Sequence, residues 1–350
     1  LLRSVGPESF SSDPLRVMRL ARMAAELGFT PEHETVRLAS ASAPTLSDVA
    51  AERVFAELRL TIASDRAVAG IELAHSVGAT AAVLPELDAL RGLEQSDYHH
   101  LDVYQHTLAT LQATIDIAND PGATFGELGP GLRQVLDEPL ANELTRGQAL
   151  RFGALVHDIA KPLTRAISPE GRPTFFEHDV RGAEMATQIL TRLRASERLI
   201  VYVAALARHH LRLGFLVHEQ PLAPRTVYRY LATCEPVEVD VTVLSVADRL
   251  ATLGRNADRA VAAHVDLSQE ILADALAWRL QRPRPPIAGD ELAQALDIFP
   301  GPQLGRLLAE LTEAAYAGEI ESEQQALAHA RDWLVHDTGV APARGGSGDR

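Results

Sequence analysis

Apolar residues recur at spacings of three and four along most of the chain, which is the period of an amphipathic α-helix. One such stripe consists of Leu101, Tyr104, Leu108, Leu111 and Ile115. Runs of alternating β-branched residues, which would indicate strands, are few. The pattern therefore predicts an all-α protein.

Residues that start and stop helices divide this pattern into segments. Asp13 followed by Pro14 predicts the N-cap and first residue of one helix, and Gly28 predicts its end. A second helix is expected at 48–62, with further short helices after it. The stretch 117–141 is rich in Gly, Pro, Asp and Asn, so we expect a long connection there with room for a short helix.

The prolines at 282–286 mark the clearest boundary in the second half of the chain. Consecutive prolines neither donate backbone hydrogen bonds nor continue a helix. Earlier breaks are expected at 161–173 and 218–224. The segment 289–334 then forms a separate helical unit, and the tail 337–350, which contains Gly-Gly-Ser-Gly, is expected to be disordered.

Composition and charge narrow the class of protein. The formal net charge of the 350 residues is -14 at pH 7, whereas binding nucleic acid over a whole surface requires Lys and Arg that neutralise phosphates, so any RNA contact is expected to be local. Cys234 is the only cysteine, which excludes an intramolecular disulfide and favours a reducing cytoplasm. No apolar run approaches the roughly 18–20 residues of a membrane span, so we expect no membrane association.

Histidines and aspartates follow one another in an order typical of a metal site between helices. The set is His106, His157, Asp158, His178, His209, His210 and Asp248. Imidazole nitrogens and carboxylate oxygens are ligands for divalent ions. The residues before Asp158 are apolar around the whole helix, and an unpaired carboxylate buried there would cost roughly several kcal/mol without a cation. We therefore interpret the set as candidate ligands of one or two ions.

Plainer roles remain open for each of these residues. Neighbours on a helix diverge by about 100°, so only one residue of the pair His209-His210 is expected to reach a given ion. The sequence is also compatible with an ordinary buried histidine at position 106, a cap or an ion pair with Lys161 for Asp158, and an ion pair with Arg249 or Arg255 for Asp248.

The same residues, with the run His-Asp-Ile-Ala-Lys-Pro at 157–162, resemble the core of HD-domain phosphohydrolases over about 97–253. This resemblance implies one or two divalent ions (Mg, Mn, Ni or Fe) that activate water for attack on a phosphate ester. It implies catalytic roles for His157 and Asp158, and for Lys161 a role in holding the substrate phosphate. Ala160 stands where many relatives have Gly.

The flanking segments resemble bacterial tRNA nucleotidyltransferases of the CCA-adding and poly(A) polymerase type. In that family an acidic residue and an arginine, three apart on the neck helix, read the incoming base, which implies this role for Asp13 and Arg16. Ser12 replaces the first acidic residue of that pattern. The resemblance rests on 12–23, 27–29, Glu52-Arg53 with Glu57-Leu58, 98–103 and 286–320.

The resemblance also implies a domain order. It comprises neck and body helices at 1–95, an HD metal domain at 96–270, a helical tRNA-contacting unit at 271–336 and the tail. The Gly-rich turn and the Asp-x-Asp pair of the family's polymerase head do not precede Asp13. The chain opens at Leu1 as though within a longer sequence, so we expect a C-terminal portion whose head lies upstream.

The predicted function is that of the C-terminal part of a tRNA nucleotidyltransferase with a metal-dependent phosphohydrolase domain. The implied partners are tRNA, CTP and ATP in the full-length enzyme, and a small phosphoester at the HD site. Nucleotidyl transfer by this chain alone is not expected. The sequence also allows a free-standing HD-domain phosphodiesterase or phosphatase, and a non-catalytic RNA-binding helical module.

Overall fold

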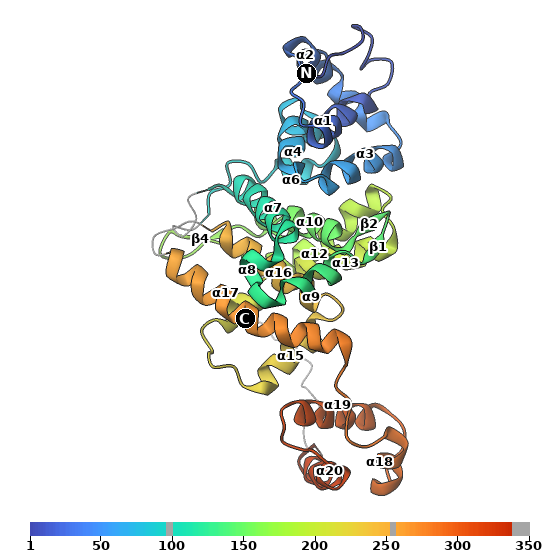
Figure 1. The fold of residues 1–350 in the computed structure, drawn as a ribbon, viewed down its shortest axis with the longest axis vertical. Helices are drawn as coiled ribbons and strands as arrows, with labels where there is room; N and C mark the ends of the chain where they lie inside the picture. The colour runs from blue at the N-terminus through green and yellow to red at the C-terminus, as the bar shows by residue number, and fades with distance from the viewer. Residues whose placement is uncertain (96–100, 253–256, 338–350) are drawn as a thin grey trace, which may run out of the picture. The chain divides into compact units, whose positions relative to one another are not determined.

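The computed structural model describes residues 1–95, 101–252 and 257–337, and this part of the chain is built almost entirely of helices, as predicted (Figure 1). The α-helices are α1 (Leu15–Leu27), α2 (His33–Ser42), α3 (Ala51–Ala63), α4 (Ala67–Ser76), α5 (Ala79–Val83), α6 (Pro85–Asp88), α7 (Val103–Asn119), α8 (Pro121–Phe125), α9 (Gly129–Leu136), α10 (Arg146–Val156), α11 (Lys161–Thr164), α12 (His178–Arg192), α13 (Glu197–His209), α14 (Arg212–Leu216), α15 (Pro224–Cys234), α16 (Glu238–Leu250), α17 (Ala257–Leu280), α18 (Gly289–Leu296), α19 (Pro302–Tyr316) and α20 (Glu323–Asp337).

The remaining elements are short. Two 3-10 helices, η1 (Ala43–Asp48) and η2 (Gly126–Leu128), join neighbouring α-helices. The strands form two antiparallel pairs, which are β1 (Pro139–Ala141) with β2 (Leu144–Thr145) and β3 (Ala166–Ile167) with β4 (Pro173–Thr174).

The stretch 117–141 contains more helix than its composition suggested. The Asp120 side chain accepts a hydrogen bond from the backbone N–H of Ala123 and caps α8. Pro121 and Pro130 occupy first turns, where a missing N–H costs nothing. The expectation of a long connection was therefore wrong, because here the prolines start helices instead of ending them.

The first helix begins differently from the prediction. It starts at Leu15 and has no side-chain cap, because the Asp13 carboxylate is paired with Arg53 (3.2 Å) and not with its own helix. Its predicted end is confirmed, since Gly28 adopts a left-handed conformation (φ 65°) that is strained for other residues. The helix expected at 48–62 is confirmed as α3.

Two compact units make up the described chain. Unit 1 contains Leu1–His218 and Cys234–Leu276, and unit 2 contains Glu219–Thr233 and the chain from Ala277 onward. Unit 2 has its own core, formed by Ile287, Leu292, Leu304, Leu307, Leu311, Ala314, Ile320, Ala326 and Ala330. The predicted disorder of the tail concerns residues that, apart from Asp337, lie outside the described chain, as do 98–100, Gly254 and Arg255.

Helix α10 lies at the centre of unit 1, where it packs against α3, α7, α13 and α16. Its N-terminus is fixed by a capping box in which Thr145 and Gln148 exchange side-chain and backbone hydrogen bonds (3.2 and 3.0 Å). Arg151, which is buried, donates to the carbonyls of Ala63 and Ser64 at the end of α3 (2.7 and 2.8 Å). The C-terminal end of α10 is therefore held in a fixed position within the core.

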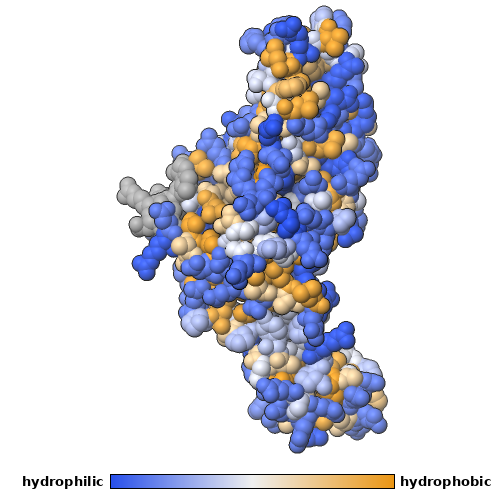
Figure 2. Space-filling model, in the orientation of Figure 1, coloured by the Kyte–Doolittle hydropathy of each residue, from blue (hydrophilic) through white to orange (hydrophobic). Residues whose placement is uncertain are grey.

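The face drawn in Figure 2 is mostly hydrophilic, with smaller hydrophobic areas between polar residues. Among the described residues, the segment Glu197–Leu216, which covers α13 and α14, is long and apolar enough to cross a membrane by length and composition alone. Leu199, Val203 and Leu206 of this segment are fully buried inside unit 1, whereas Val201 and Phe215 are exposed, so the segment packs one apolar face into the core.

Candidate metal centre

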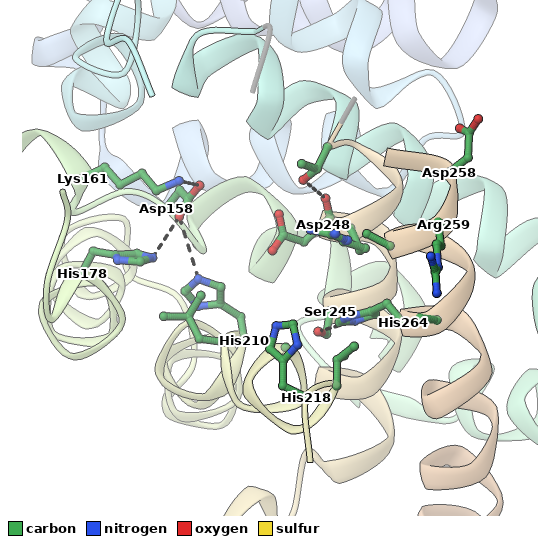
Figure 3. Close-up of a pocket in the computed structure, with 17 residues that line it drawn as sticks. Asp158, Lys161, His178, His210, His218, Ser245, Asp248, Asp258, Arg259 and His264 are labelled. Atoms are coloured by element: carbon green, nitrogen blue, oxygen red, sulfur yellow. Dashed lines mark hydrogen bonds and ion pairs between the residues drawn. The ribbon is translucent and has the colours of Figure 1, made fainter. Parts of the chain in front are cut away.

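The candidate ligands are brought together in unit 1 by several helices, and Figure 3 shows Asp158, His178, His210 and Asp248 among them. His106 lies on α7, and Asp248 lies on α16. The other ligands occupy helix ends: His157 is the C-cap of α10 and is followed by Asp158, His178 begins α12, and His210 is the C-cap of α13. At the end of a helix the backbone changes direction, so a side chain there can point into the core. Residues from distant parts of the sequence therefore meet at one point.

The ligand atoms form two groups of three. The first trio is His106, His157 and Asp248, and the second trio is Asp158, His178 and His210; within each trio the ligand atoms lie within 4.8 Å of one another. All six residues are buried except Asp248, which is partly exposed. Nitrogen and oxygen atoms grouped in this way suit a divalent ion.

Asp158 lies between the two trios. Its Oδ1 is 3.3 Å from His178 Nε2 and 3.8 Å from His210 Nε2, while its Oδ2 is 3.2 Å from His157 Nε2. In the first trio, His106 Nε2 is 2.8 Å from Asp248 Oδ1. One carboxylate therefore faces the imidazoles of both groups with different oxygens, and these residues together would hold one or two divalent ions.

The backbone fixes the direction of the imidazole rings. In His157, His178 and His210 the Nδ1 atom lies 2.6–2.8 Å from the carbonyl oxygen of the residue three positions earlier, namely Ala154, Phe175 and Ala207. A ring that donates from Nδ1 leaves the lone pair of Nε2 available. Within the described chain, Nε2 of His157 and of His210 is buried without a hydrogen-bond partner, and each faces an Asp158 oxygen at 3.2 and 3.8 Å. These atoms fit a metal ion, which would satisfy them.

The electrostatics favour the metal-binding protonation states of Asp158, Asp248 and His210, whereas burial opposes the charge of His157 but the carboxylates of Asp158 and Asp248 raise its pKa. Burial alone would raise the pKa of Asp158, but His157 and Lys161 hold that pKa well below its ordinary value. Burial opposes ionisation of Asp248 in the same way, and the hydrogen bond and charge of His106 lower its pKa. Burial, followed by the charge of His157, lowers the pKa of His210 to about 4. Ionised carboxylates and a neutral imidazole are the ligand forms.

Lys161 and His209 lie close to the trios but belong to neither of them. Lys161 Nζ lies 2.6 Å from Asp158 Oδ2 and donates to Gln95 Oε1 at 2.6 Å, so the ion pair that the sequence allowed for Asp158 is present. His209 belongs to neither trio, and its Nδ1 accepts a hydrogen bond from Arg212 Nε (2.9 Å). The structure therefore brings His210, not its neighbour, to the site.

Asp13 and Arg16 lie at the start of α1 and have separate partners. Arg16 donates to the backbone carbonyl of Ser9 (2.9 Å), and Asp13 pairs with Arg53. Neither residue belongs to the metal trios or lines the cavity beside them.

A cavity of about 990 Å³ opens beside the trios, and some of its polar residues carry no motif. Ser245 Oγ lies 3.0 Å from Nε2 of the buried His264 in its wall. Ser245 could have been found from its position three residues before Asp248 on the same helix. No sequence signal pointed to His264, or to Gln95 as the partner of Lys161, because both contacts join distant segments.

Two family models match this chain. Residues 28–91 match a model described as the probable RNA and SrmB-binding site of polymerase A, and residues 103–253 match the HD domain. The second match contains every residue of the two trios.

Solved structures show the same fold at low sequence identity. A Thermotoga maritima CCA-adding enzyme complexed with tRNA is 14% identical, with a TM-score of 0.53 over 94% of this chain. A Bacillus stearothermophilus CCA-adding enzyme in complex with CTP is 16% identical, with a TM-score of 0.54 over 95% of this chain. This chain spans 63% and 64% of those two chains, which is less than two thirds of each.

Curated relatives are more similar in sequence. The A-adding tRNA nucleotidyltransferase of Deinococcus radiodurans is 32% identical over 345 residues, which cover 97% of this chain and 72% of the relative. The CC-adding tRNA nucleotidyltransferase of Thermus thermophilus is 33% identical over 341 residues, which cover 95% and 69%. With this similarity along nearly its whole length, and with an HD domain inside it, the chain belongs to the tRNA nucleotidyltransferase family.

Proposed function

We propose that the metal centre makes this chain a divalent-metal-dependent phosphohydrolase. The observation that carries the proposal is the pair of trios around Asp158, in which buried Nε2 atoms lack hydrogen-bond partners. Bound ions would lower the pKa of water and neutralise phosphoryl oxygens. His106, His157, His178, His210, Asp158 and Asp248 would hold the ions, and Lys161 would place its positive charge beside the substrate phosphate.

We further propose that the activity of the whole protein is nucleotide addition to tRNA. Residues 1–95 would then serve as neck and body, 96–270 as the HD domain and 271–336 as a tRNA-contacting unit. The family-model match at 28–91 and the relatives named for A-adding and CC-adding activity support this assignment. CTP and ATP would meet Asp13 and Arg16, and tRNA would be the macromolecular partner.

The two adjacent histidines of α13 provide a test of the metal site. His210→Ala is expected to weaken Mn²⁺ binding at least roughly 10–100-fold, because it removes a buried ligand, and losing a residue that only orients a ligand already has an effect of this size. His209→Ala is expected to leave binding within about twofold, because His209 lies outside both trios. Calorimetric titration of metal-free protein with Mn²⁺ measures both, and hydrolysis of a nucleoside 2′,3′-cyclic phosphate is followed in parallel.

Equal effects of the two substitutions would contradict the assignment of His210 as a ligand. If the unmodified protein neither binds Mn²⁺, Ni²⁺, Mg²⁺ or Fe²⁺ nor hydrolyses the phosphoester, the histidines and aspartates have a structural role only, and the proposed phosphohydrolase function fails.

A second test concerns base selection at the neck. In a full-length enzyme that carries a polymerase head, Arg16→Ala is expected to reduce the preference for CTP and ATP over GTP and UTP, because a mismatched hydrogen-bonding edge costs about 1–3 kcal/mol. The present chain is expected to incorporate no labelled CTP into tRNA. Arg37→Ala, which removes an equally charged exposed residue of α2 paired with Glu34, is the control. If Arg16→Ala leaves the preference among nucleotides unchanged but lowers the melting temperature, Arg16 has a structural role and does not read the base.

A further inference from the structure

Lys161 is the only lysine of this chain, and every other Lys or Arg position is an arginine. It is also buried, with 8% of its surface exposed, and it lines the cavity beside the metal centre. An ammonium is a compact point charge with three rotatable N–H donors, whereas a guanidinium is a larger planar fork, so the two are not interchangeable in a tight site. The neighbours of Lys161 therefore have to suit an ammonium.

Three groups lie around the Nζ atom of Lys161. Asp158 Oδ2 and Gln95 Oε1 each lie 2.6 Å from it, and the centroid of the Phe175 ring lies 5.5 Å from it. The carboxylate and amide oxygens accept hydrogen bonds from the ammonium, and the face of the ring attracts its positive charge. Figure 3 shows the Lys161 side chain reaching Asp158. Gln95 is thus an uncharged acceptor that the ammonium uses beside the carboxylate.

The segment that carries Gln95 is fixed to the start of α7. The backbone N–H of Gly92 donates to Asp102 Oδ2 (2.7 Å), and the Gln95 Nε2 atom lies 3.5 Å from the carbonyl oxygen of Leu101, to which it donates. Gln95 lies outside the residues that either family model matches. The contact with Lys161 therefore brings a residue from the segment before α7 to the metal centre.

The oxygen of Asp158 that pairs with Lys161 also faces the first trio, because Oδ2 lies 3.2 Å from His157 Nε2. A cation held by that trio would draw on the same oxygen, so the ammonium loses its charged acceptor when Asp158 acts as a ligand. A buried ammonium without an acceptor is costly. Gln95 Oε1 is the acceptor that the ammonium then keeps, and it holds the positive charge at the cavity wall.

We propose that Gln95 is a positioning residue of the metal centre, which holds the Lys161 ammonium at the cavity and so leaves Asp158 available to a metal ion. This inference rests on the proposed phosphohydrolase function and adds to it a residue from outside the matched HD domain. Its consequence is that any effect of Gln95 on metal binding depends on the presence of Lys161.

Calorimetric titration of metal-free protein with Mn²⁺ tests this dependence. Gln95→Leu is expected to weaken Mn²⁺ binding about tenfold, because the ammonium then relies on Asp158 and competes with the ion for its oxygen. In the Lys161→Met background the same substitution is expected to change the affinity by less than about twofold, since the interaction is already absent. Gln95→Glu keeps an oxygen within reach of the ammonium and is expected to bind Mn²⁺ at least as tightly as the unmodified protein.

Gln112→Leu is the matched control, because Gln112 is a glutamine of α7 whose side chain donates to Asp116 (2.9 Å) and not to the metal centre. It is expected to leave Mn²⁺ binding unchanged. The inference is overturned if Gln95→Leu causes no loss, if its loss persists in the Lys161→Met background, or if Gln95→Glu causes a similar loss. If Gln95→Leu lowers the melting temperature, Gln95→Ala replaces it with the same expectations.

A measurement without metal separates this inference from the proposed function. Because the chain has one lysine, protein labelled with ¹⁵N at the lysine Nζ is expected to give a single ammonium signal in nuclear magnetic resonance. A buried, hydrogen-bonded ammonium exchanges its protons slowly with water, so Gln95→Leu is expected to lose this signal and Gln112→Leu to keep it. If the unmodified protein binds no Mn²⁺, the phosphohydrolase proposal fails. The signal still decides whether Gln95 holds the ammonium, and an unchanged signal in Gln95→Leu overturns that role.

Discussion

Replacing Asp158 by asparagine is expected to reduce phosphoester hydrolysis by about 10³-fold or more and to remove stoichiometric metal binding. Asparagine keeps the shape of the side chain but loses the charge and replaces one oxygen by an NH₂ group, which cannot bind a cation. Because the Asp158 oxygens face His157 on one side and His178 and His210 on the other, the substitution affects both trios at once. Losing the several kcal/mol that bound ions provide corresponds to such a rate change.

Elemental analysis and the kcat for a nucleoside 2′,3′-cyclic phosphate measure this prediction, and circular dichroism checks that the helices remain. Asp179→Asn is the matched control, because Asp179 lies on α12 beside the site but pairs with Arg208 (3.0 Å) and belongs to neither trio. If Asp158→Asn hydrolyses the phosphoester at a rate within tenfold of the unmodified protein and keeps its metal content, Asp158 is not a metal ligand.

Asp240→Ala is expected to lower the free energy of unfolding of unit 1 by about 3–5 kcal/mol, because it leaves a guanidinium buried without its partner. Arg146 Nε lies 2.9 Å from both oxygens of Asp240, and the Tyr202 hydroxyl donates to Asp240 Oδ1 at 2.7 Å. Arg146 is 7% exposed and Asp240 is 0% exposed. Burial opposes the charge of Arg146, but Asp240 raises the pKa of the guanidinium overall.

Urea unfolding followed by circular dichroism measures this loss. The double variant Arg146→Met, Asp240→Leu is expected to recover most of it, since two apolar side chains leave no buried charge. Glu34→Gln breaks the exposed ion pair with Arg37 and is expected to have no measurable effect. A loss below about 1 kcal/mol for Asp240→Ala would mean that water or another residue replaces the carboxylate.

The metal centre could be predicted from the sequence because its chemistry is confined to a few residue types in a recognisable order. The apolar residues before His157 predicted a buried helix end, and α10 ends there. The choice between His209 and His210 depended on the exact rotation of α13, which helix periodicity does not define to within one residue. The sequence could only limit the choice to one of the pair.

Contacts between distant segments could not be predicted in this way. Asp13 and Pro14 form a favourable local signal for a helix cap, but Arg53, which lies 40 residues later, takes the carboxylate instead. A local sequence pattern shows which nearby backbone groups a side chain can bind. It contains no information about a partner residue on another helix. The same limit applies to His264 and Gln95, whose roles depend on segments that meet only after folding.

The hydrogen bonds between the three histidine rings and backbone carbonyls limit the positions at which residues can be inserted or deleted. Each ring is oriented by a backbone oxygen three positions earlier, at Ala154, Phe175 and Ala207, so its ligand direction is fixed within a four-residue segment. An insertion or deletion inside such a segment would turn the ring away from the site. The hairpin of β3 and β4 lies outside these segments and has exposed residues at its turn, including Gly171. We therefore expect a change of length in this hairpin to leave the directions of these three rings unaltered.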